Sequence, residues 1–295
     1  MENKVYFHLP GLFAHASLYK LFLQLYRTER EKFNDWIEIG SIFGSPRTAC
    51  WGGGRIPNSP DMSEVEIIAF MKEYHIPCRL TFSNSLIEEK HLLDVYCNYL
   101  LDIFYWEGNS IIVNSPILES YIREKYPMYK IISSTTKCLN DTTTALNELN
   151  NDYEMVVLDY NFNKDFEFLE GIQDKDKCEL LINPVCMPNC PRRKQHYIYM
   201  SKALLHILDD SPNFGCPYQG AKFFQAQKNP LFISVKDIHD IYMPMGFKHF
   251  KIEGRTAAWD DLIEILLYYL VKPEYQLEMR EKIYFGLNNI EDIQY

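Results

Sequence analysis

The chain has 295 residues, 47% of them hydrophobic, and a formal net charge of −10. This length suits one large domain or two ordinary ones, and no stretch approaches the roughly 20 consecutive apolar residues that span a bilayer. The acidic charge argues against nucleic acid as a partner and leaves room only for a local basic groove near Arg192, Arg193 and Lys194.

Short apolar runs bounded by turn residues alternate with apolar residues at helical spacing. We expect strands over residues 5–8, 36–39, 78–82, 110–113, 130–133, 154–158, 180–182 and 249–252. We expect helices from about 12 to 34, after capping boxes that begin at Ser63 and Ser85, and over 117–126, 142–149, 166–172, 194–208, 235–242 and 259–271. A tail over 275–295 is also expected to be helical.

Eight strands that alternate with helices predict an α/β fold, a (β/α)8 barrel of the TIM type. The barrel is expected to be a single domain over residues 1–271, with a loop-rich excursion at about 191–245 and a helical tail over 272–295 packed on the barrel. A doubly wound open sheet is the alternative, but no G-x-G-x-x-G motif follows the first strand to support it.

The loop after the seventh predicted strand carries Cys186 and Cys190, spaced C-x3-C and bracketed by Pro188 and Pro191. The prolines hold this loop irregular, so both thiols are presented from a loop. The N-terminus lacks a secretory signal, so we expect a cytoplasmic protein whose cysteines are thiols or ligands rather than disulfides. Thiolates beside positive charge suit an iron–sulfur cluster or zinc.

In a (β/α)8 barrel the chemistry lies at the carboxyl ends of the strands, and this rule sorts the eight cysteines. Cys50, Cys186, Cys190 and Cys216 fall on loops at that end, and together they would supply the four thiolates of a 4Fe-4S cluster. Zinc is the competing metal, free thiols are the structural alternative, and Cys138 is a fifth candidate ligand. Cys178 is expected at the opposite end of the barrel, and Cys78 and Cys97 in the core.

The last predicted strand runs into Lys251-Ile-Glu-Gly-Arg255. Lys251 and Glu253 are two apart, so both point to the same side of the strand. Gly254 permits a sharp turn, after which Arg255 can reach a carboxylate or phosphate bidentately. We expect Arg255 and Arg47 to hold an anionic substrate, with Glu253 as acid or base. The alternative is a structural ion pair between Glu253 and Arg255 that stabilises the barrel mouth, the opening at the carboxyl ends of the strands.

Other polar residues are expected to face the same mouth. His8 ends the first predicted strand and is a catalytic candidate, with a structural role equally open. His196 follows the cysteine loop and either binds substrate or caps that loop. Asn84 follows the third strand, and with Arg47, Lys251 and His196 it completes the set of expected substrate-binding residues.

The five consecutive residues from Lys251 to Arg255 resemble the hallmark of the collagenase-like peptidase family, near the end of its barrel. The resemblance extends more weakly along the chain. Leu9-Pro10-Gly11 resembles the opening turn of the family, residues 39–47 its glycine-plus-arginine loop, and residues 81–84 the end of its third strand.

The resemblance implies one of several activities. Some members of the family are peptidases, and others are oxygen-independent hydroxylases of ubiquinone precursors, tRNA or ribosomal RNA. The hydroxylases carry a cluster bound by four cysteines, and several depend on prephenate. One ubiquinone-pathway member takes a ligand from the loop after strand two, as Cys50 would here, and its last two ligands resemble the present C-x3-C. This chain is shorter than the RNA-modifying members, which disfavours RNA as the substrate.

Three functions are therefore carried forward. The first is an iron–sulfur enzyme, most simply an oxygen-independent hydroxylase of a small or prenylated molecule or of a peptide, with prephenate as the oxygen donor. The second is a peptidase, although the chain has no G-x-S-x-G or H-E-x-x-H motif. The third is a non-catalytic barrel that forms a heterodimer with a related chain.

Overall fold

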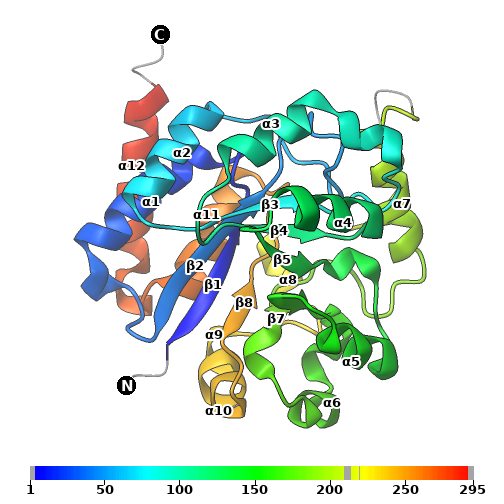
Figure 1. Cartoon of the computed structure of the whole chain (residues 1–295). Coiled ribbons are helices and arrows are strands. Elements are labelled where there is room, and N and C mark those ends of the chain that lie inside the picture. Colours follow the sequence, from blue (N-terminus) through cyan, green and yellow to red (C-terminus); the bar gives the residue numbers. More distant parts are fainter. Residues whose placement is uncertain (1–3, 209–213, 219, 292–295) are drawn as a thin grey trace.

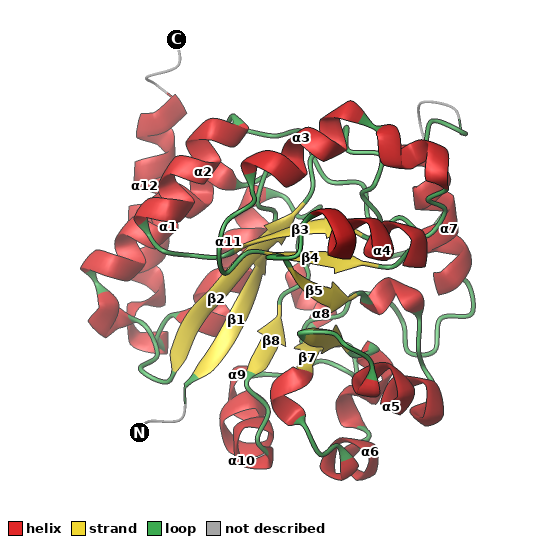
Figure 2. Cartoon of the chain, in the orientation of Figure 1, coloured by secondary structure: helices red, strands yellow, loops and turns green. Residues whose placement is uncertain are grey.

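Eight parallel strands close into a barrel in sequence order, β1 to β8, in a computed structural model that describes residues 4–208, 214–218 and 220–291 (Figures 1 and 2). The predicted (β/α)8 fold is confirmed. The strands are β1 Val5–Pro10, β2 Ile37–Gly44, β3 Cys78–Phe82, β4 Ser110–Val113, β5 Lys130–Ser133, β6 Met155–Val157, β7 Cys178–Leu181 and β8 His249–Lys251.

The α-helices lie outside the barrel and cover its strands, as Figure 2 shows. They are α1 Ala16–Thr28, α2 Glu64–Glu73, α3 Val95–Ile103, α4 Pro116–Lys125, α5 Thr142–Asn150, α6 Phe166–Gly171, α7 Arg193–Leu204, α8 Phe223–Ala226, α9 Val235–Asp237, α10 Met243–Met245, α11 Trp259–Leu270 and α12 Gln276–Glu291. A π-helical turn, Ile238–Tyr242, joins α9 to α10. None of the described helices combines the length and apolar composition that a membrane crossing needs.

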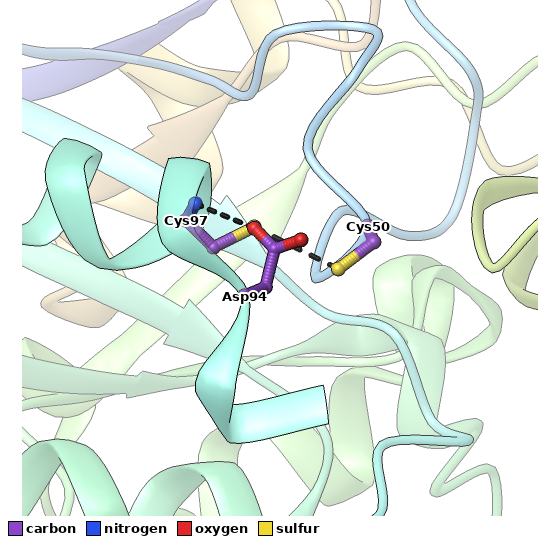
Figure 3. A group of neighbouring side chains, drawn as sticks. All are labelled: Cys50, Asp94 and Cys97. Carbon is purple, nitrogen blue, oxygen red and sulfur yellow. Dashed lines mark hydrogen bonds between the residues drawn. The ribbon is translucent and has the colours of Figure 1, made fainter. Parts of the chain in front are cut away.

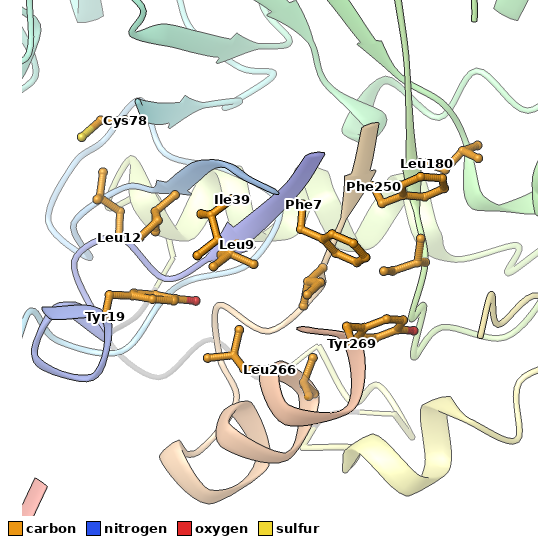
Figure 4. Packing of buried hydrophobic residues seen from close by; sticks show 14 of the residues in the cluster. Phe7, Leu9, Leu12, Tyr19, Ile39, Cys78, Leu180, Phe250, Leu266 and Tyr269 are labelled. Atoms are coloured by element: carbon orange, nitrogen blue, oxygen red, sulfur yellow. The ribbon is translucent and has the colours of Figure 1, made fainter. Parts of the chain in front are cut away.

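The main core lies between the outer faces of the strands and the helices. Phe7 of β1, Phe250 of β8 and Tyr269 of α11 meet there, with Phe7 6.0 Å from each of the other two rings (Figure 4). Each large side chain buried in this way contributes roughly 1.5–3 kcal/mol to stability. A second apolar cluster consists of Phe43, Ile112, Ile132, Met155 and Val157.

Several expected element boundaries are wrong, and two of the differences have a clear physical reason. The second strand does not stop at Ile39, because a bulge at Gly40 shifts the register from Phe7–Ile39 to His8–Ser41 and pairing then continues to Gly44. A capping box does form at Ser63, as expected, but none forms at Ser85. The backbone N–H of Ser85 donates to Ser201 of α7, and α3 begins only at Val95 with Asp94 as its N-cap.

The C-terminal helix α12 packs against α1 and α11 (Figure 1). Lys282 of α12 forms an ion pair with Glu29 at the end of α1. Arg280 binds both carboxylate oxygens of Glu264 in α11, at 2.6 and 2.7 Å. Helix α12 is therefore fixed to the outside of the barrel.

Candidate active site at the barrel mouth

A charged network lies inside the barrel. Glu179 of β7 is fully buried and accepts hydrogen bonds from Arg79 of β3 and, at 2.9 Å, from Lys251 of β8. Burial alone would raise the pKa of the Glu179 carboxyl, but the charges of Lys251 and Arg79 hold it well below its usual range. The acid of the network is therefore ionised and paired with two cations.

His8 belongs to this interior network. Arg79 donates to its Nε2 at 3.2 Å, so Nδ1 carries the proton and donates to Ser41 at 2.8 Å. Its Nε2 also lies 3.0 Å from Nδ1 of His249. Burial lowers the pKa of His8 well below its usual value, and Arg79 lowers it further. A Cβ on Gly40 would lie 2.7 Å from the His8 ring, so the glycine at the bulge makes room for this histidine.

Lys251 connects the interior to the mouth. Its Nζ lies 4.0 Å from the centre of the Phe43 ring, and the residue lines a cavity of about 70 Å³ at the carboxyl ends of the strands. Burial lowers the pKa of Lys251 to about 8, although Glu179 acts in the opposite direction. An amine with this pKa can give up and take back a proton near neutral pH.

Glu253 lies at the mouth, two residues beyond Lys251 on the same side of the chain. Asn183 fixes its backbone, accepting from the N–H at 2.7 Å and donating to the carbonyl at 2.8 Å. Its carboxylate pairs with Arg55 and accepts from the backbone N–H of Val185 at 3.3 Å. The expected alternative of a Glu253–Arg255 pair is therefore replaced by a Glu253–Arg55 pair.

The two terminal nitrogens of the Arg255 guanidinium group differ in their hydrogen bonding. Its Nη2 donates to the Gly53 carbonyl at 3.0 Å, and its Nη1 is buried without any hydrogen-bond partner. Burial lowers the pKa of Arg255 to about 10, and the charge of Arg55 lowers it further. Gly54 takes φ +78°, and a Cβ there would lie 2.9 Å from Nη2. This glycine therefore lets the loop close over the guanidinium group.

Three adjoining cavities cross the mouth. The central one is lined by Lys251, Glu253 and Arg255, and a neighbour of about 280 Å³ shares Arg55 and Glu253 with it. On the other side, a cavity of about 580 Å³ shares Thr136 and Tyr197 with the central one. The central cavity therefore adjoins a larger cavity on each side, through shared lining residues.

Two expected substrate-binding residues have other positions. Arg47 is exposed and lines none of these cavities, and the arginine that reaches the mouth from the same loop is Arg55. Asn84 is fully buried and braces the protein. Its Nδ2 donates to the carbonyls of Cys50 and Ser201, at 2.8 and 3.2 Å, and its Oδ1 accepts from Leu86 at 2.9 Å. The Asn84 amide is therefore hydrogen-bonded to neighbouring segments of the protein and is not available to a substrate.

His196 lies on α7 beside the mouth. Its ring stacks on Phe214, with centres 4.6 Å apart and planes 2° apart. Burial lowers its pKa to about 4, and Arg55 and Arg192 lower it further. The residue is therefore a neutral ring near Arg55, held by the excursion after β7.

Four cysteines lie on segments that follow β5 and β7, at the carboxyl ends of the strands: Cys138, Cys186, Cys190 and Cys216. Cys186 is buried, and its sulfur accepts from Arg55 at 3.6 Å. Burial raises the pKa of this thiol, and the charges of Glu253 and Cys216 contribute. Burial likewise raises the pKa of Cys138, with contributions from Asp159 and Cys190.

The side chain of Cys50 turns away from this group. Its sulfur lies 3.9 Å from that of Cys97 in α3, beside the Asp94 carboxylate (Figure 3). Cys97 is buried, as expected, but it is a neighbour of Cys50 rather than an isolated core residue. Cys78 and Cys178 are buried at the first positions of β3 and β7, where the sequence predicted them.

Several residues of the site were not predicted. Arg55 follows Gly52-Gly53-Gly54, and that glycine run was the available signal for a loop that approaches other backbone closely. Glu179 stands in an otherwise apolar strand, which signals a paired interior charge.

Arg193 is a further buried cation at the mouth, at the start of α7. It binds Asp159, donates to Thr135 at 2.9 Å and lies 4.1 Å from the centre of the Tyr160 ring. Its charge lowers the pKa values of Cys138 and Cys186 against the larger effect of burial. Arg193 and Arg55 thus supply positive charge next to the cysteine loops.

Comparisons with known proteins agree with this architecture. No family model matches the chain. An uncharacterized protease of Methanocaldococcus jannaschii is 21% identical over 181 residues, which are 60% of this chain and 53% of that protein, so the match spans about half of the relative. The solved structure of a U32 peptidase superposes with a TM-score of 0.55 at 14% identity, covering 86% of this chain and 94% of the other. The resemblance to the collagenase-like, or U32, peptidases is therefore confirmed as a similarity, to the first protein over part of the sequence and to the second in the fold.

Proposed function

We propose that the chain is an enzyme that acts at the barrel mouth on a substrate with an anionic group, and that Arg255 binds this group. The observation that carries the proposal is the buried, unpartnered Nη1 of Arg255, since a charged donor left without an acceptor is costly unless a ligand supplies one. A carboxylate or phosphate in the central cavity would provide that acceptor.

Proton transfer is assigned to Lys251 and Glu253, which line the same cavity as Arg255. Lys251, with a pKa of about 8, can act as the base in its neutral form. Glu253 forms an ion pair with Arg55 and orients that arginine toward the cavity. His8 is removed from direct catalysis in this proposal, because all its contacts lie in the interior network.

The mouth cysteines suit a 4Fe-4S cluster, with one change to the expected ligand set. Cys138 replaces Cys50, so the proposed ligands are Cys138, Cys186, Cys190 and Cys216. Four thiols on neighbouring loops beside Arg55 and Arg193 are the donor set and the positive surroundings that such a cluster favours. When bound, the cluster would supply electron transfer or bind an oxygen donor such as prephenate, which makes an oxygen-independent hydroxylase the leading activity.

The test is anaerobic purification followed by iron and sulfide analysis. We expect near four irons and four sulfides per chain, and loss of most of both in Cys138→Ala and Cys186→Ala. Cys50→Ala is the matched control and should keep its iron. Zinc at these cysteines, no metal, or equal iron loss in the control would contradict this ligand set. A loaded protein should then be assayed for hydroxylation with prephenate.

A peptidase is the second candidate, and the names of the two similar proteins favour it. The row of three adjoining cavities at the mouth suits a peptide, and Glu253 is placed to activate a water for attack on a peptide bond. Peptide cleavage by metal-free protein, abolished in Glu253→Gln but unchanged in Cys186→Ala, would establish this activity in place of the hydroxylase.

A further inference from the structure

Three potential metal ligands meet at a point separate from the mouth cysteines. The sulfurs of Cys50 and Cys97 and a carboxylate oxygen of Asp94 all lie within 4.8 Å of one another. Figure 3 shows these side chains converging between the loop after β2 and the first turn of α3. In the described part of the chain, no other set of three or more histidine, cysteine, aspartate or glutamate ligand atoms is gathered this closely.

We propose that Cys50, Asp94 and Cys97 bind a single zinc-type divalent ion that ties the loop after β2 to α3. Two thiolates on one tetrahedral ion, each about 2.3 Å from it, lie about 3.8 Å apart. The observed separation of the two sulfurs is 3.9 Å. A disulfide instead requires about 2.05 Å between the sulfurs, and it would not explain the Asp94 carboxylate beside them.

The local fold already holds these ligands in place. Asp94 is the N-cap of α3 and accepts from the backbone N–H of Cys97 at 2.7 Å, so the D-x-x-C spacing brings both side chains to one end of the helix. The Trp51 indole donates to the His91 carbonyl at 2.8 Å and fixes the loop next to this helix end. Cys50 is half-buried, which leaves room for a water as the fourth ligand.

The ion would act on the mouth through the loop. Gly53, which accepts from Arg255, and Arg55, which binds Glu253, follow Cys50 closely in the sequence. Anchoring Cys50 to α3 therefore fixes the segment that shapes the anion site. The ion has a structural role here and takes no part in the reaction at the mouth.

The metal content of the full chain tests the proposal. The measurement is made on a Cys186→Ala/Cys190→Ala background, so that zinc on the mouth cysteines is not counted. We expect about one zinc per chain after gel filtration, and cobalt substitution should give a thiolate-to-metal charge-transfer band. Adding Cys50→Ser, Cys97→Ser or Asp94→Asn should remove the zinc and the band, whereas adding Cys178→Ser should keep both.

Cys97 is buried, so Cys97→Ser can fail to fold. Cys50 is partly exposed, so Cys50→Ser is expected to fold and provides the decisive measurement in that case. Zinc content that is unchanged in Cys50→Ser would overturn the proposal. So would a metal-free protein in which mass spectrometry finds Cys50 and Cys97 joined by a disulfide, or in which both thiols react freely in the presence of excess zinc.

Discussion

Two groups of buried charges lie along the barrel axis, and they differ in how completely they are paired. In the interior network, Glu179 lies between Arg79 and Lys251, and none of the fully buried polar atoms of these three side chains lacks a hydrogen-bond partner. At the mouth, Glu253 is paired with Arg55, but Arg255 keeps one buried nitrogen without a partner. We call the interior group closed, because its fully buried polar atoms are paired, and the mouth group open, because one buried nitrogen is not.

The difference separates structural charges from functional ones. Burying a charge costs several kcal/mol unless its partners are well placed, and removal of one partner leaves the others exposed to that cost. The closed network is therefore expected to matter for folding. The open mouth retains an unpaired charge in the absence of ligand, which is what a binding site for an anion requires.

Breaking the closed network should have the largest effect on stability. Glu179→Gln leaves Arg79 and Lys251 buried without a counter-charge, so we expect a loss of about 3–5 kcal/mol in the free energy of unfolding. Urea denaturation measures this loss. Glu154→Gln, which removes an exposed pair with Lys130, is the control and should cost less than about 1 kcal/mol. Equal losses in both variants would show that the network is not structural.

The same carboxyl should make stability depend on pH. The folded-state pKa of Glu179 lies well below its ordinary value of 4.5. Its contribution is therefore fully present above that ordinary value and is lost as the pH falls below it toward the folded-state pKa. Acid titration of the unfolding free energy should show a steeper fall below pH 4.5 in the wild type than in Glu179→Gln. Parallel curves would contradict the assignment.

A change in the loop backbone should have a smaller effect and act on the mouth. Gly54→Ala places a side chain at φ +78° and against Nη2 of Arg255, so we expect a loss of about 1–2 kcal/mol in stability. The variant should also bind anions more weakly. Gly171→Ala, where an added Cβ meets no atom within 4 Å, is the control and should be close to neutral in thermal denaturation.

Removal of the open charge should have the smallest effect on stability. Arg255→Met keeps most of the side-chain volume and loses one hydrogen bond to Gly53, while relieving the burial of an incompletely paired cation. We expect a change of less than about 1 kcal/mol in the free energy of unfolding. A loss as large as that of Glu179→Gln would instead place Arg255 among the structural charges.

The fold could be predicted from the sequence because apolar runs and turns mark most strands. The bounds of β3, β4 and β5 coincide with the predicted ones. The second strand was cut short because Gly40 looks like a terminator, whereas in the structure it forms a bulge that accommodates His8. That contact joins residues distant in sequence, and local patterns do not reveal it.

The sequence predicted where the candidate site lies better than it predicted which residues form it. The run from Lys251 to Arg255 does lie at the mouth, but its partners come from other segments. A glycine-rich loop has many accessible conformations, so its sequence could not decide between Arg47 and Arg55. The direction of the Cys50 side chain depends in the same way on the packing of the loop against α3.

The most direct test of the central claim is calorimetric titration of the mouth with two anionic probes, prephenate and inorganic phosphate. The account predicts saturable binding of at least one probe by the wild type and by Arg47→Met. Arg255→Met should bind that probe at least about tenfold more weakly, since a charge-assisted hydrogen bond contributes about 1.5–3 kcal/mol and 1.4 kcal/mol is a tenfold change. Equal affinity in the Arg255 variant, or no binding of either probe by the wild type, would contradict the claim that Arg255 is the anchor of an anionic substrate.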